Sequence, residues 1–476
     1  MSAFSVQQQQ CVSLTASTQG AQQNQSTVDI ERHAPALCTF LRRVEPLVAS
    51  VIERNAKSTA FKHYEQMLLN QRDGQHHVTH TLRHAAVDAQ MGALSVDWNC
   101  TGAVVLVGYG HREAHSNWCS HAGALATWNV AKRRCDPAKA DWHSLTQCCV
   151  TSVRCHPTRP AVFGCALYNG QVCVFDVSEP PDRQLAAESA SADSHSEPIS
   201  AIQWIRPISS QQHMLATSGY DGRVILWKFT DKLQIHKLFQ ISVGALPRAL
   251  RAKVSNERPA GISAMAFGHF DVDVFLVGGE SGAVLHCNTN STSAVGTRGN
   301  QAVYNPVVLA LASHGGSVYG AAACAHQHGL FVTCAGDATA AIYNVLKVQP
   351  VARVHLHAPN AAAIPIAYDI AWAPSRPTLL AAATSDGSLC LCDLRSNETG
   401  TAARIQVTSR DRQQQQSTNS NSNSGLSSVA FNRVHSSTLA CTSVDDAVTT
   451  VLVLGDRLTA EAHDERALLT NIASRN

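Results

Sequence analysis

Seven times along the chain, a turn of small residues leads into a short apolar strand that ends on one bulky residue. The clearest copy is Asp221-Gly222-Arg223-Val224-Ile225-Leu226-Trp227. Asp-Gly between two alternating apolar runs is a strong hairpin signal, because both turn positions must accept positive φ. The repeats are separated by roughly 47 to 60 residues, a spacing typical of propeller blades. The strand-ending positions are Trp128, Phe175, Trp227, Cys287, Tyr343, Cys392 and Leu452.

Each repeat carries further apolar segments before its turn. Residues 214–218 form one such segment, and residues 199–204 form an earlier one. With a fourth strand in the variable connection, each repeat makes a four-stranded blade. The sequence therefore predicts an all-β fold, a seven-bladed WD-repeat β-propeller over residues 76–456. The alternating segment 78–82 is expected to complete the last blade and to close the ring without exposed sheet edges.

The composition limits the classes of function. With 476 residues, 45% of them hydrophobic and 15% charged, the chain can bury a large core. The net charge of +2 and the pI near 7.9 leave no basic footprint for nucleic acid. We expect no membrane span, because no run approaches about 18 apolar residues, and no signal peptide. The sixteen cysteines, many of them on expected strands, are therefore expected to be reduced and buried.

The segment before the propeller divides into two parts. Residues 1–27 are rich in Gln, Ser and Thr and are expected to be disordered. Residues 28–75 are expected to be helical, with a kink near Pro46 and a second helical patch that includes Phe61 and Leu68. This helix either packs back on the propeller or binds a partner; we favour a partner, because a propeller needs no extra helix. The predicted binding residues are Leu37, Phe40, Leu41, Val44, Leu47, Val48, Val51 and Ile52.

Three segments are expected to lie outside the regular blades. Low complexity predicts flexible insertions near residues 181–197 and 408–425. Residues 457–476 are expected to form a polar, helix-prone tail.

Two glycines after His314 are expected to make a tight entry into an inner strand. A side chain at Gly315 would then be crowded, so we expect this loop to be structural.

One cluster has the residue types of a metal site: His111, His115, Cys119 and His121. All four lie in one hairpin loop, whereas structural zinc sites usually combine two ligand pairs separated by a longer loop. We therefore expect a polar loop without metal. The chain has no Gly-Lys dipeptide, which excludes a Walker A loop, and neither Gly-x-Ser-x-Gly nor His-Glu-x-x-His appears. We expect a protein that is not an enzyme and has no cofactor.

Cys392-Asp393-Leu394-Arg395 resembles the Trp-Asp-x-Arg box of propellers that recruit substrates to cullin ubiquitin ligases. The first position is Cys in place of Trp, and one copy occurs. An ordinary blade end with a surface arginine is the favoured interpretation, and a substrate receptor remains an alternative.

Several motifs are similar to those of dynein intermediate chains. Asn117-Trp118-Cys119-Ser120-His121 resembles a stretch of the first blade in that family, and the run from His156 to Asp176 resembles the next blade. Residues 313–319 and 372–377 resemble its central His-x-Gly-x-Val-Tyr and Trp-Ser-Pro-x-x-Pro segments. These matches are colinear over about residues 94–455.

Within the family, the helix and Ser58-x-Ala60-Phe61 are most similar to the smaller intermediate chain of the intraflagellar-transport dynein. The resemblance implies a non-catalytic subunit whose propeller binds a heavy-chain tail, beside a second intermediate chain, and whose helix binds a roadblock-type light chain. A second light chain that reads Thr-Gln-Thr would bind upstream, but the segments at Thr18 and Thr27 depart from that motif. The implied location is the cytoplasm, the cytoskeleton and the cilium or flagellum with its base. The alternatives are another dynein class, a cullin-ligase receptor, and a propeller enzyme or metal-binding module.

Overall fold

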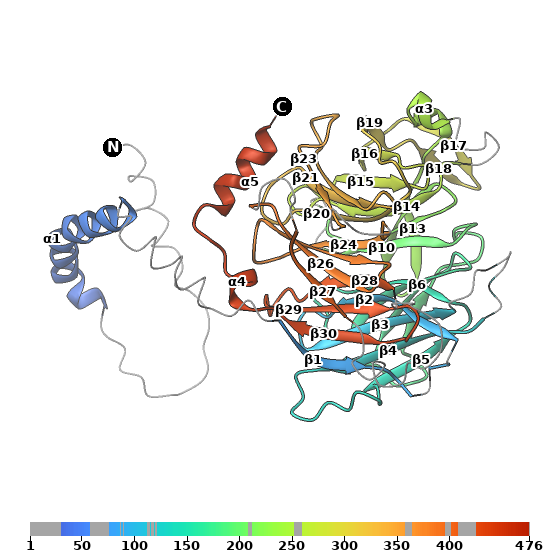
Figure 1. The fold of residues 1–476 in the computed structure, drawn as a ribbon, viewed down its shortest axis with the longest axis horizontal. Coiled ribbons are helices and arrows are strands. Elements are labelled where there is room, and N and C mark those ends of the chain that lie inside the picture. The colour runs from blue at the N-terminus through green and yellow to red at the C-terminus, as the bar shows by residue number, and fades with distance from the viewer. Residues whose placement is uncertain are drawn as a thin grey trace. The chain divides into compact units, whose positions relative to one another are not determined.

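The computed structural model describes residues 30–57 and 76–475, apart from a set of short internal segments (Figure 1). Those segments are residues 86, 89, 112–114, 116–118, 120, 208–211, 252–258, 358–363, 396–400 and 408–424. The chain divides into two compact units, with the boundary between residues 71 and 72. The expected leader, the helical patch around Phe61 and Leu68 and nearly all of the insertion near residues 408–425 lie outside the described residues.

The first unit contains one long helix, α1 (Ile30–Lys57), of 28 residues. Pro35 and Pro46 both lie inside it. A proline lacks the N–H that would bond the carbonyl four residues earlier, so it bends a helix rather than continuing it straight. Figure 1 shows α1 bent part-way along its length, in agreement with the kink expected from the sequence.

The second unit is a seven-bladed β-propeller. In the described residues the strands form seven sheets, and each sheet is a blade. Blade 1 contains β2 (Met91–Trp98), β3 (Val104–His111), β4 (Gly123–Asn129) and β5 (Trp142–Thr146). Blade 2 contains β6 (Val150–Cys155), β7 (Val162–Leu167), β8 (Val172–Asp176) and β9 (Leu185–Glu188). Blade 3 contains β10 (Ile199–Ile205), β11 (Met214–Gly219), β12 (Arg223–Phe229) and β13 (Leu233–Gln240).

The remaining blades repeat the same antiparallel order. Blade 4 contains β14 (Ile262–Phe267), β15 (Val274–Gly279), β16 (Val284–Asn288) and β19 (Val307–Leu311). Blade 5 contains β20 (Val318–Ala323), β21 (Leu330–Ala335), β22 (Thr339–Asn344) and β23 (Ala352–His355). Blade 6 contains β24 (Ala367–Trp372), β25 (Leu379–Thr384), β26 (Ser388–Asp393) and β27 (Thr401–Gln406). Blade 7 contains β28 (Leu426–Phe431), β29 (Thr438–Ser443), β30 (Thr449–Val453) and β1 (His77–Leu82).

A few elements lie between or after the blades. The η2 turn (Val243–Ala245) and α3 (Arg248–Arg251) connect blades 3 and 4. A hairpin of β17 (Ala294–Arg298) and β18 (Gln301–Tyr304) extends from blade 4, and β18 pairs in parallel with β13 at the outer edge of blade 3. Two helices follow the last blade: α4 (Asp456–Thr459) and α5 (Glu465–Ser474).

The ring closes by pairing the two ends of the propeller. β1 runs antiparallel to β30, with Val78 opposite Leu452 and Leu82 opposite Thr449. This confirms that the segment 78–82 completes the last blade. The innermost strands contact one another in a complete circle, in the order β2, β6, β10, β14, β20, β24, β28 and back to β2.

The core consists of seven apolar layers between neighbouring blades. Each hydrophobic cluster combines side chains of two consecutive blades, and the cluster of blades 7 and 1 includes Leu82 of β1. Hydrogen bonds between inner strands add to these layers: the Trp98 indole donates to the Ala430 carbonyl, and the Cys155 N–H donates to Asp97. Each blade is therefore stabilised mainly by its two neighbours, and the ring must be complete to bury every layer.

The seven strand-ending positions occupy equivalent places in the structure. Each lies on the third strand of its blade, is buried, and faces a large apolar residue on the second strand. Trp227, for example, lies opposite Leu215, and Tyr343 lies opposite Phe331. The repeat read from the sequence is thus a repeat of core positions. The members are Trp128, Phe175, Trp227, Cys287, Tyr343, Cys392 and Leu452.

The glycine loop before blade 5 differs from the expectation. A Cβ at Gly315 would lie 3.6 Å from the Asp337 side chain, which is an ordinary contact, and no crowding results there. The tight position is Gly316, whose Cβ would lie 3.2 Å from the Asp337 backbone nitrogen. The loop is structural for another reason: His314 is buried and bonds to Asp337 and Thr333.

The segment 181–197 was expected to be a flexible insertion, and the structure corrects this. It contains strand β9 and the buried residues Ser189, Ser194 and His195. The Ser189 and Ser194 hydroxyls bond to each other at 2.8 Å, and His195 bonds to blade 3. Composition alone predicted flexibility because Ser, Ala and acidic residues dominate the segment, but Ser189, Ser194 and His195 form buried hydrogen bonds that hold it.

The closure of the ring can be tested with two truncations. A fragment lacking residues 1–75 keeps β1 and every blade, so we expect it to be soluble, monodisperse and as heat-stable as the whole chain. A fragment lacking residues 1–83 also loses β1, which exposes the edge of β30 and removes Leu82 from the core. We expect this shorter fragment to aggregate or to melt at a clearly lower temperature in thermal unfolding and gel filtration. Equal behaviour of the two fragments would contradict the closure.

Candidate functional site

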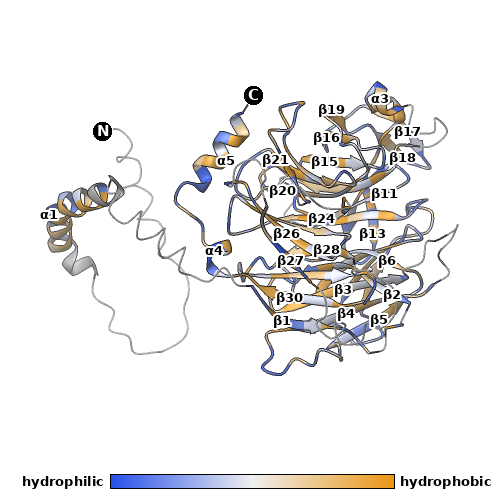
Figure 2. Cartoon of the chain, viewed as in Figure 1, coloured by the Kyte–Doolittle hydropathy of each residue, from blue (hydrophilic) through white to orange (hydrophobic). Residues whose placement is uncertain are grey.

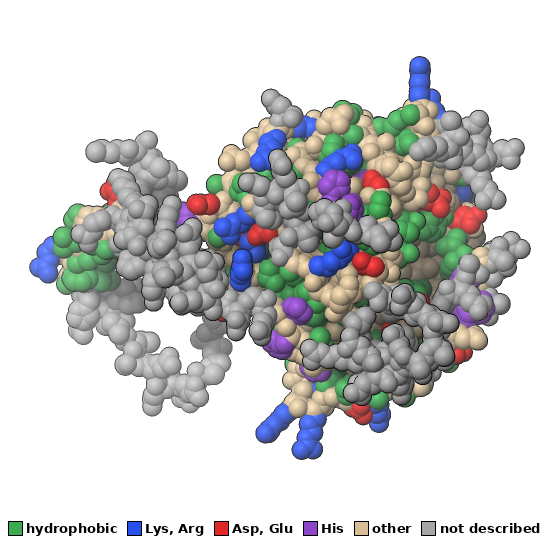
Figure 3. Space-filling view, in the orientation of Figure 1, with side chains coloured by type: hydrophobic (Ala, Val, Ile, Leu, Met, Phe, Trp, Pro, Cys, Tyr) green, Lys and Arg blue, Asp and Glu red, His purple; other side chains and the backbone are tan. Residues whose placement is uncertain are grey.

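Helix α1 presents a continuous apolar stripe. Along the helix, orange and blue segments alternate in Figure 2, and hydrophobic side chains gather on α1 in Figure 3. Seven of the eight predicted binding residues are between 43% and 65% exposed, and Val44 is half-buried. A stripe of this size at three- and four-residue spacing is typical of a helix that buries one face against another surface. The residues are Leu37, Phe40, Leu41, Val44, Leu47, Val48, Val51 and Ile52.

Blade 3 contains a chain of buried hydrogen bonds that explains its strong repeat signature. The Trp227 indole N–H donates to the Thr217 hydroxyl at 2.9 Å, and Thr217 lies 2.9 Å from His195 Nε2. His195 Nδ1 lies 2.9 Å from the Asp221 carboxylate. Because the Asp221 carboxylate can only accept, His195 Nδ1 is the donor of this bond. Burial alone would raise the pKa of Asp221, but the hydrogen bond and charge of His195 outweigh it and the pKa is lowered.

Blade 5 carries a variant of this chain. His314 Nε2 lies 2.8 Å from the Thr333 hydroxyl and Nδ1 lies 3.1 Å from Asp337, as in blade 3. Tyr343 takes the place of the tryptophan and donates its hydroxyl to the Ala312 carbonyl at 2.7 Å. These polar groups fasten a loop to the blade that follows it. The strand-ending residues therefore belong to the interior and do not form a partner surface.

The inner strands line a central channel of about 630 Å³. Side chains from all seven blades face it, among them Ser95, Arg154, Tyr319 and Asp369. Burial raises the pKa of the Asp369 carboxyl, although Arg154, the Val429 N–H and the Ser428 hydroxyl favour its charged form. Since Asp369 Oδ2 accepts from the Ser428 hydroxyl and the Val429 N–H of blade 7, this carboxyl joins blades 6 and 7.

A further candidate ligand, Cys149, lies beside the His–Cys cluster that the sequence predicted. One ligand atom each of His115, Cys119, His121 and Cys149 lie within 4.8 Å of one another. His115 Nε2 is 3.2 Å from Cys119 Sγ. Cys149 comes from the start of blade 2, directly before β6, whereas the other three follow β3 of blade 1. We expected no metal because all the candidate ligands lay in one loop. In the structure, the packing of blade 2 against blade 1 adds Cys149 to His115, Cys119 and His121.

His111, the fourth member of the predicted cluster, has a different position. Its ring stacks on His121 with centroids 4.0 Å apart, and its Nε2 lies 3.0 Å from Gln90 Oε1. The loop therefore contains a candidate set of two imidazoles and two thiols, with His111 packed against it. Burial raises the pKa of the Cys149 thiol to about 11. Burial also opposes ionisation of Cys119, but hydrogen bonds from Cys149 and its neighbours outweigh it and lower the pKa of Cys119.

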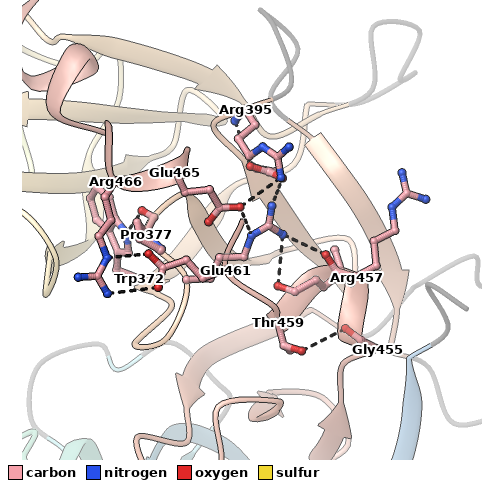
Figure 4. Close-up of polar contacts among 12 residues, drawn as sticks. Trp372, Pro377, Arg395, Gly455, Arg457, Thr459, Glu461, Glu465 and Arg466 are labelled. Atoms are coloured by element: carbon pink, nitrogen blue, oxygen red, sulfur yellow. Dashed lines mark hydrogen bonds and ion pairs between the residues drawn. The ribbon is translucent and has the colours of Figure 1, made fainter. Parts of the chain in front are cut away.

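The segment after the last blade docks on the propeller through the buried Arg376, whose partners Glu465 and Arg457 are labelled in Figure 4. Arg376 donates to Glu465 at 2.8 Å and to Asp393 at 2.5 Å, and it also donates to the carbonyls of Arg457 and Leu458 at 3.3 Å. The Arg376 and Glu465 side chains are almost fully buried. We call this set of contacts the C-terminal clasp. An arginine so placed satisfies two carboxylates and two helix carbonyls at once.

The clasp continues along helix α5. Leu469 and Ala473 pack into the core layer between blades 5 and 6. At the far end of α5, Asn344 donates to the Ala473 carbonyl at 3.0 Å and Lys347 donates to the Ser474 carbonyl at 2.9 Å. A cation at the carbonyl end of a helix is stabilising. The segment expected as a polar tail is thus part of the propeller, and the spacing of Glu465, Leu469, Ile472 and Ala473 is the signal that indicates its buried face.

Two residues of the box at Cys392–Arg395 form contacts of the C-terminal clasp. Asp393 bonds to Arg376, and Arg395 bonds to Glu465 at 3.3 Å. Cys392 is buried in the core. These contacts favour the interpretation of an ordinary blade end, because the charged groups of the box have partners within the chain.

Residues 180–228 match the WD domain, G-beta repeat family. This stretch contains the whole hydrogen-bond chain of blade 3, from His195 to Trp227. The match agrees with the seven-bladed architecture of the second unit.

Comparison with characterised proteins finds similarity to dynein intermediate chains. Cytoplasmic dynein 2 intermediate chain 2 of Mus musculus is 29% identical over 379 residues, which cover 78% of this chain and 69% of the relative. The protein of the same name from Homo sapiens is 29% identical over 384 residues, 79% of this chain and 70% of the relative. The chain is a homologue of cytoplasmic dynein 2 intermediate chain 2. Dynein axonemal intermediate chain 4 of Homo sapiens is 22% identical over 308 residues, 61% of this chain and 33% of that protein.

None of the helices in the described part of this dynein 2 intermediate chain homologue has the length and apolarity needed to cross a membrane.

The clasp of this homologue makes a testable contribution to stability. Arg376→Ala leaves the buried carboxylate of Glu465 without its main partner, and we expect a loss of about 3–5 kcal/mol in chemical denaturation. Arg466→Ala is the matched control, because it removes a solvent-exposed pair with Glu461 and should leave the stability almost unchanged. Similar small losses for both variants would show that the clasp does not hold α5 to the ring.

Proposed function

We propose that this chain is a non-catalytic intermediate chain of a cytoplasmic dynein motor that serves retrograde intraflagellar transport. Its propeller binds the tail of a dynein heavy chain, beside a second intermediate chain, and helix α1 binds a roadblock-type light chain. The proposed location is the cytoplasm, the cytoskeleton and the cilium or flagellum with its base. The observation that carries the proposal is the exposed apolar stripe of α1 in a chain whose second unit is a complete propeller.

The propeller supports the heavy-chain role because it is rigid and self-contained. Its ring is closed by β1, and its outer edge at blade 3 is covered by the β17–β18 hairpin. Closed rings of this kind offer a broad surface without edges that pair at random. Its buried polar groups fasten separate parts of the fold: Asp369 joins blades 6 and 7, and Arg376 joins blade 6 to α5. This favours a scaffold over a catalytic role.

The helix supports the light-chain role through its chemistry. An amphipathic helix binds by laying its apolar face into a partner's groove. The stripe of α1 includes Leu41, Val44 and Val48, while the helical spacing places Arg42 and Glu53 on the other side. A soluble helix with seven large exposed apolar residues requires a cover, and the roadblock-type light chain is the cover that the family resemblance implies.

The alternatives have weaker support. The alternative of a cullin-ligase receptor depends on the box at Cys392–Arg395. Its charged groups form hydrogen bonds within the chain, which weakens this alternative. An axonemal intermediate chain is less well supported, because the axonemal relative covers 61% of this chain at 22% identity.

The helix assignment can be tested with a double variant. Leu41→Glu with Val48→Glu places two charges on the stripe while keeping good helix-forming residues. Burial of a Leu or Val side chain contributes roughly 1.5–3 kcal/mol, so we expect binding of the light chain to weaken by several powers of ten. Heavy-chain binding by the propeller should survive. A pull-down of both partners with the full chain measures the two effects together.

The matched control is Thr39→Glu with Ala49→Glu, which adds the same charge away from the stripe and should retain both partners. Retention of the light chain by the Leu41/Val48 variant would refute the assignment of α1. Loss of both partners by that variant would show instead that α1 packs on the propeller.

A further inference from the structure

The His–Cys cluster of blades 1 and 2 has no part in the proposed binding of heavy and light chains. Its four side chains come from two separate segments: the loop after β3 supplies three, and the residue before β6 supplies the fourth. Structural zinc sites usually combine ligands from two separate segments, and this cluster does so. The described groups are His115, Cys119, His121 and Cys149.

The spacing of the ligand atoms fits a small tetrahedral ion. Zinc bonds thiolate sulfur at about 2.3 Å and imidazole nitrogen at about 2.0–2.1 Å, so ligand atoms around it lie roughly 3.5 Å apart. The four atoms here lie within 4.8 Å of one another, and His115 Nε2 lies 3.2 Å from Cys119 Sγ. Closing around an ion would require movements of about 1 Å, which side-chain rotation in a loop allows.

The donor set selects the metal. Two thiolates with two imidazoles are typical of zinc, whereas carboxylates and carbonyls would favour magnesium or calcium. Backbone N–H groups already point at both sulfurs: the Cys149 N–H donates to Cys119 Sγ at 3.4 Å, and the His111 N–H donates to Cys149 Sγ at 3.1 Å. Such bonds stabilise the negative charge of a metal-bound thiolate.

The surroundings hold the two imidazoles in place. The His115 ring stacks on Tyr168 of blade 2 with centroids 4.1 Å apart, and the His121 ring stacks on His111. His121 Nδ1 is buried and has no hydrogen-bond partner in the described part of the chain. A buried polar nitrogen normally finds a partner, and a bound cation close to the ring accounts for its position.

We propose that this cluster is a structural zinc site that fastens the β3–β4 loop of blade 1 to the first strand of blade 2. Its ligands are His115, Cys119, His121 and Cys149. The ion is bound by four protein groups and leaves no open position for chemistry, so it acts on stability alone.

The first test is the metal content of the full chain, purified with a tag that does not bind metals and without chelators. We expect about one zinc per chain by mass spectrometry of the elements. Cys119→Ser with Cys149→Ser should reduce the content to near zero. The matched control is Cys148→Ser, which changes a neighbouring thiol outside the ligand set and should retain the ion.

The second test needs no variant and therefore does not depend on folding of the cysteine mutants. Zinc in the wild-type chain is replaced by Co²⁺, and the absorption spectrum is recorded. We expect sulfur-to-cobalt charge transfer and the strong visible bands of tetrahedral cobalt. We also expect a chelator to lower the melting temperature of the wild-type chain and zinc to restore it.

The outcomes separate the proposal from its rivals. Absence of zinc from the chain both as purified and after incubation with zinc would overturn it. So would a cobalt spectrum without sulfur ligation, or full zinc content in the double cysteine variant. A disulfide between Cys119 and Cys149 in the purified chain, found by peptide mass mapping without reduction, would also overturn it.

Discussion

Pairing of β1 with β30 is the contact on which the rest of the structure depends. It joins residues 77–82 to residues 449–453, which bound the entire propeller. Since each core layer lies between two blades, the layer of blades 7 and 1 exists only when this pair has formed, and Leu82 fills part of it. The helix α1 precedes this strand in the chain, so the same segment that closes the ring also connects the proposed light-chain site to the proposed heavy-chain scaffold.

Buried polar groups then fix how neighbouring parts of the ring meet. His195 and His314 hold loops against blades 3 and 5, Asp369 joins blades 6 and 7, and Arg376 holds helix α5. Each of these groups has a charged or hydrogen-bonding partner, which offsets the cost of burying it. Such bonds between separate parts of the ring suit the scaffold role proposed for the propeller.

The repeat and the ring closure could be predicted from sequence because they depend on local patterns. Turn residues, alternating strands and the bulky residue ending at Trp227 all lie within a few positions of one another. The features that were missed depend on contacts between distant segments. Cys149 meets Cys119 only after two blades have packed, and Glu465 meets Arg376 across 89 positions. His195 was hidden in a segment whose composition indicates flexibility, since its partner Asp221 lies 26 positions later.

The most direct test of the central claim is to identify what the whole chain assembles with. The tagged full chain is captured from ciliated cells at near-endogenous level, and its partners are quantified by mass spectrometry. We predict that the heavy chain of cytoplasmic dynein 2, a second intermediate chain and a roadblock-type light chain are enriched together in comparable amounts. Enrichment of a cullin ligase or of axonemal heavy chains in their place would contradict the account.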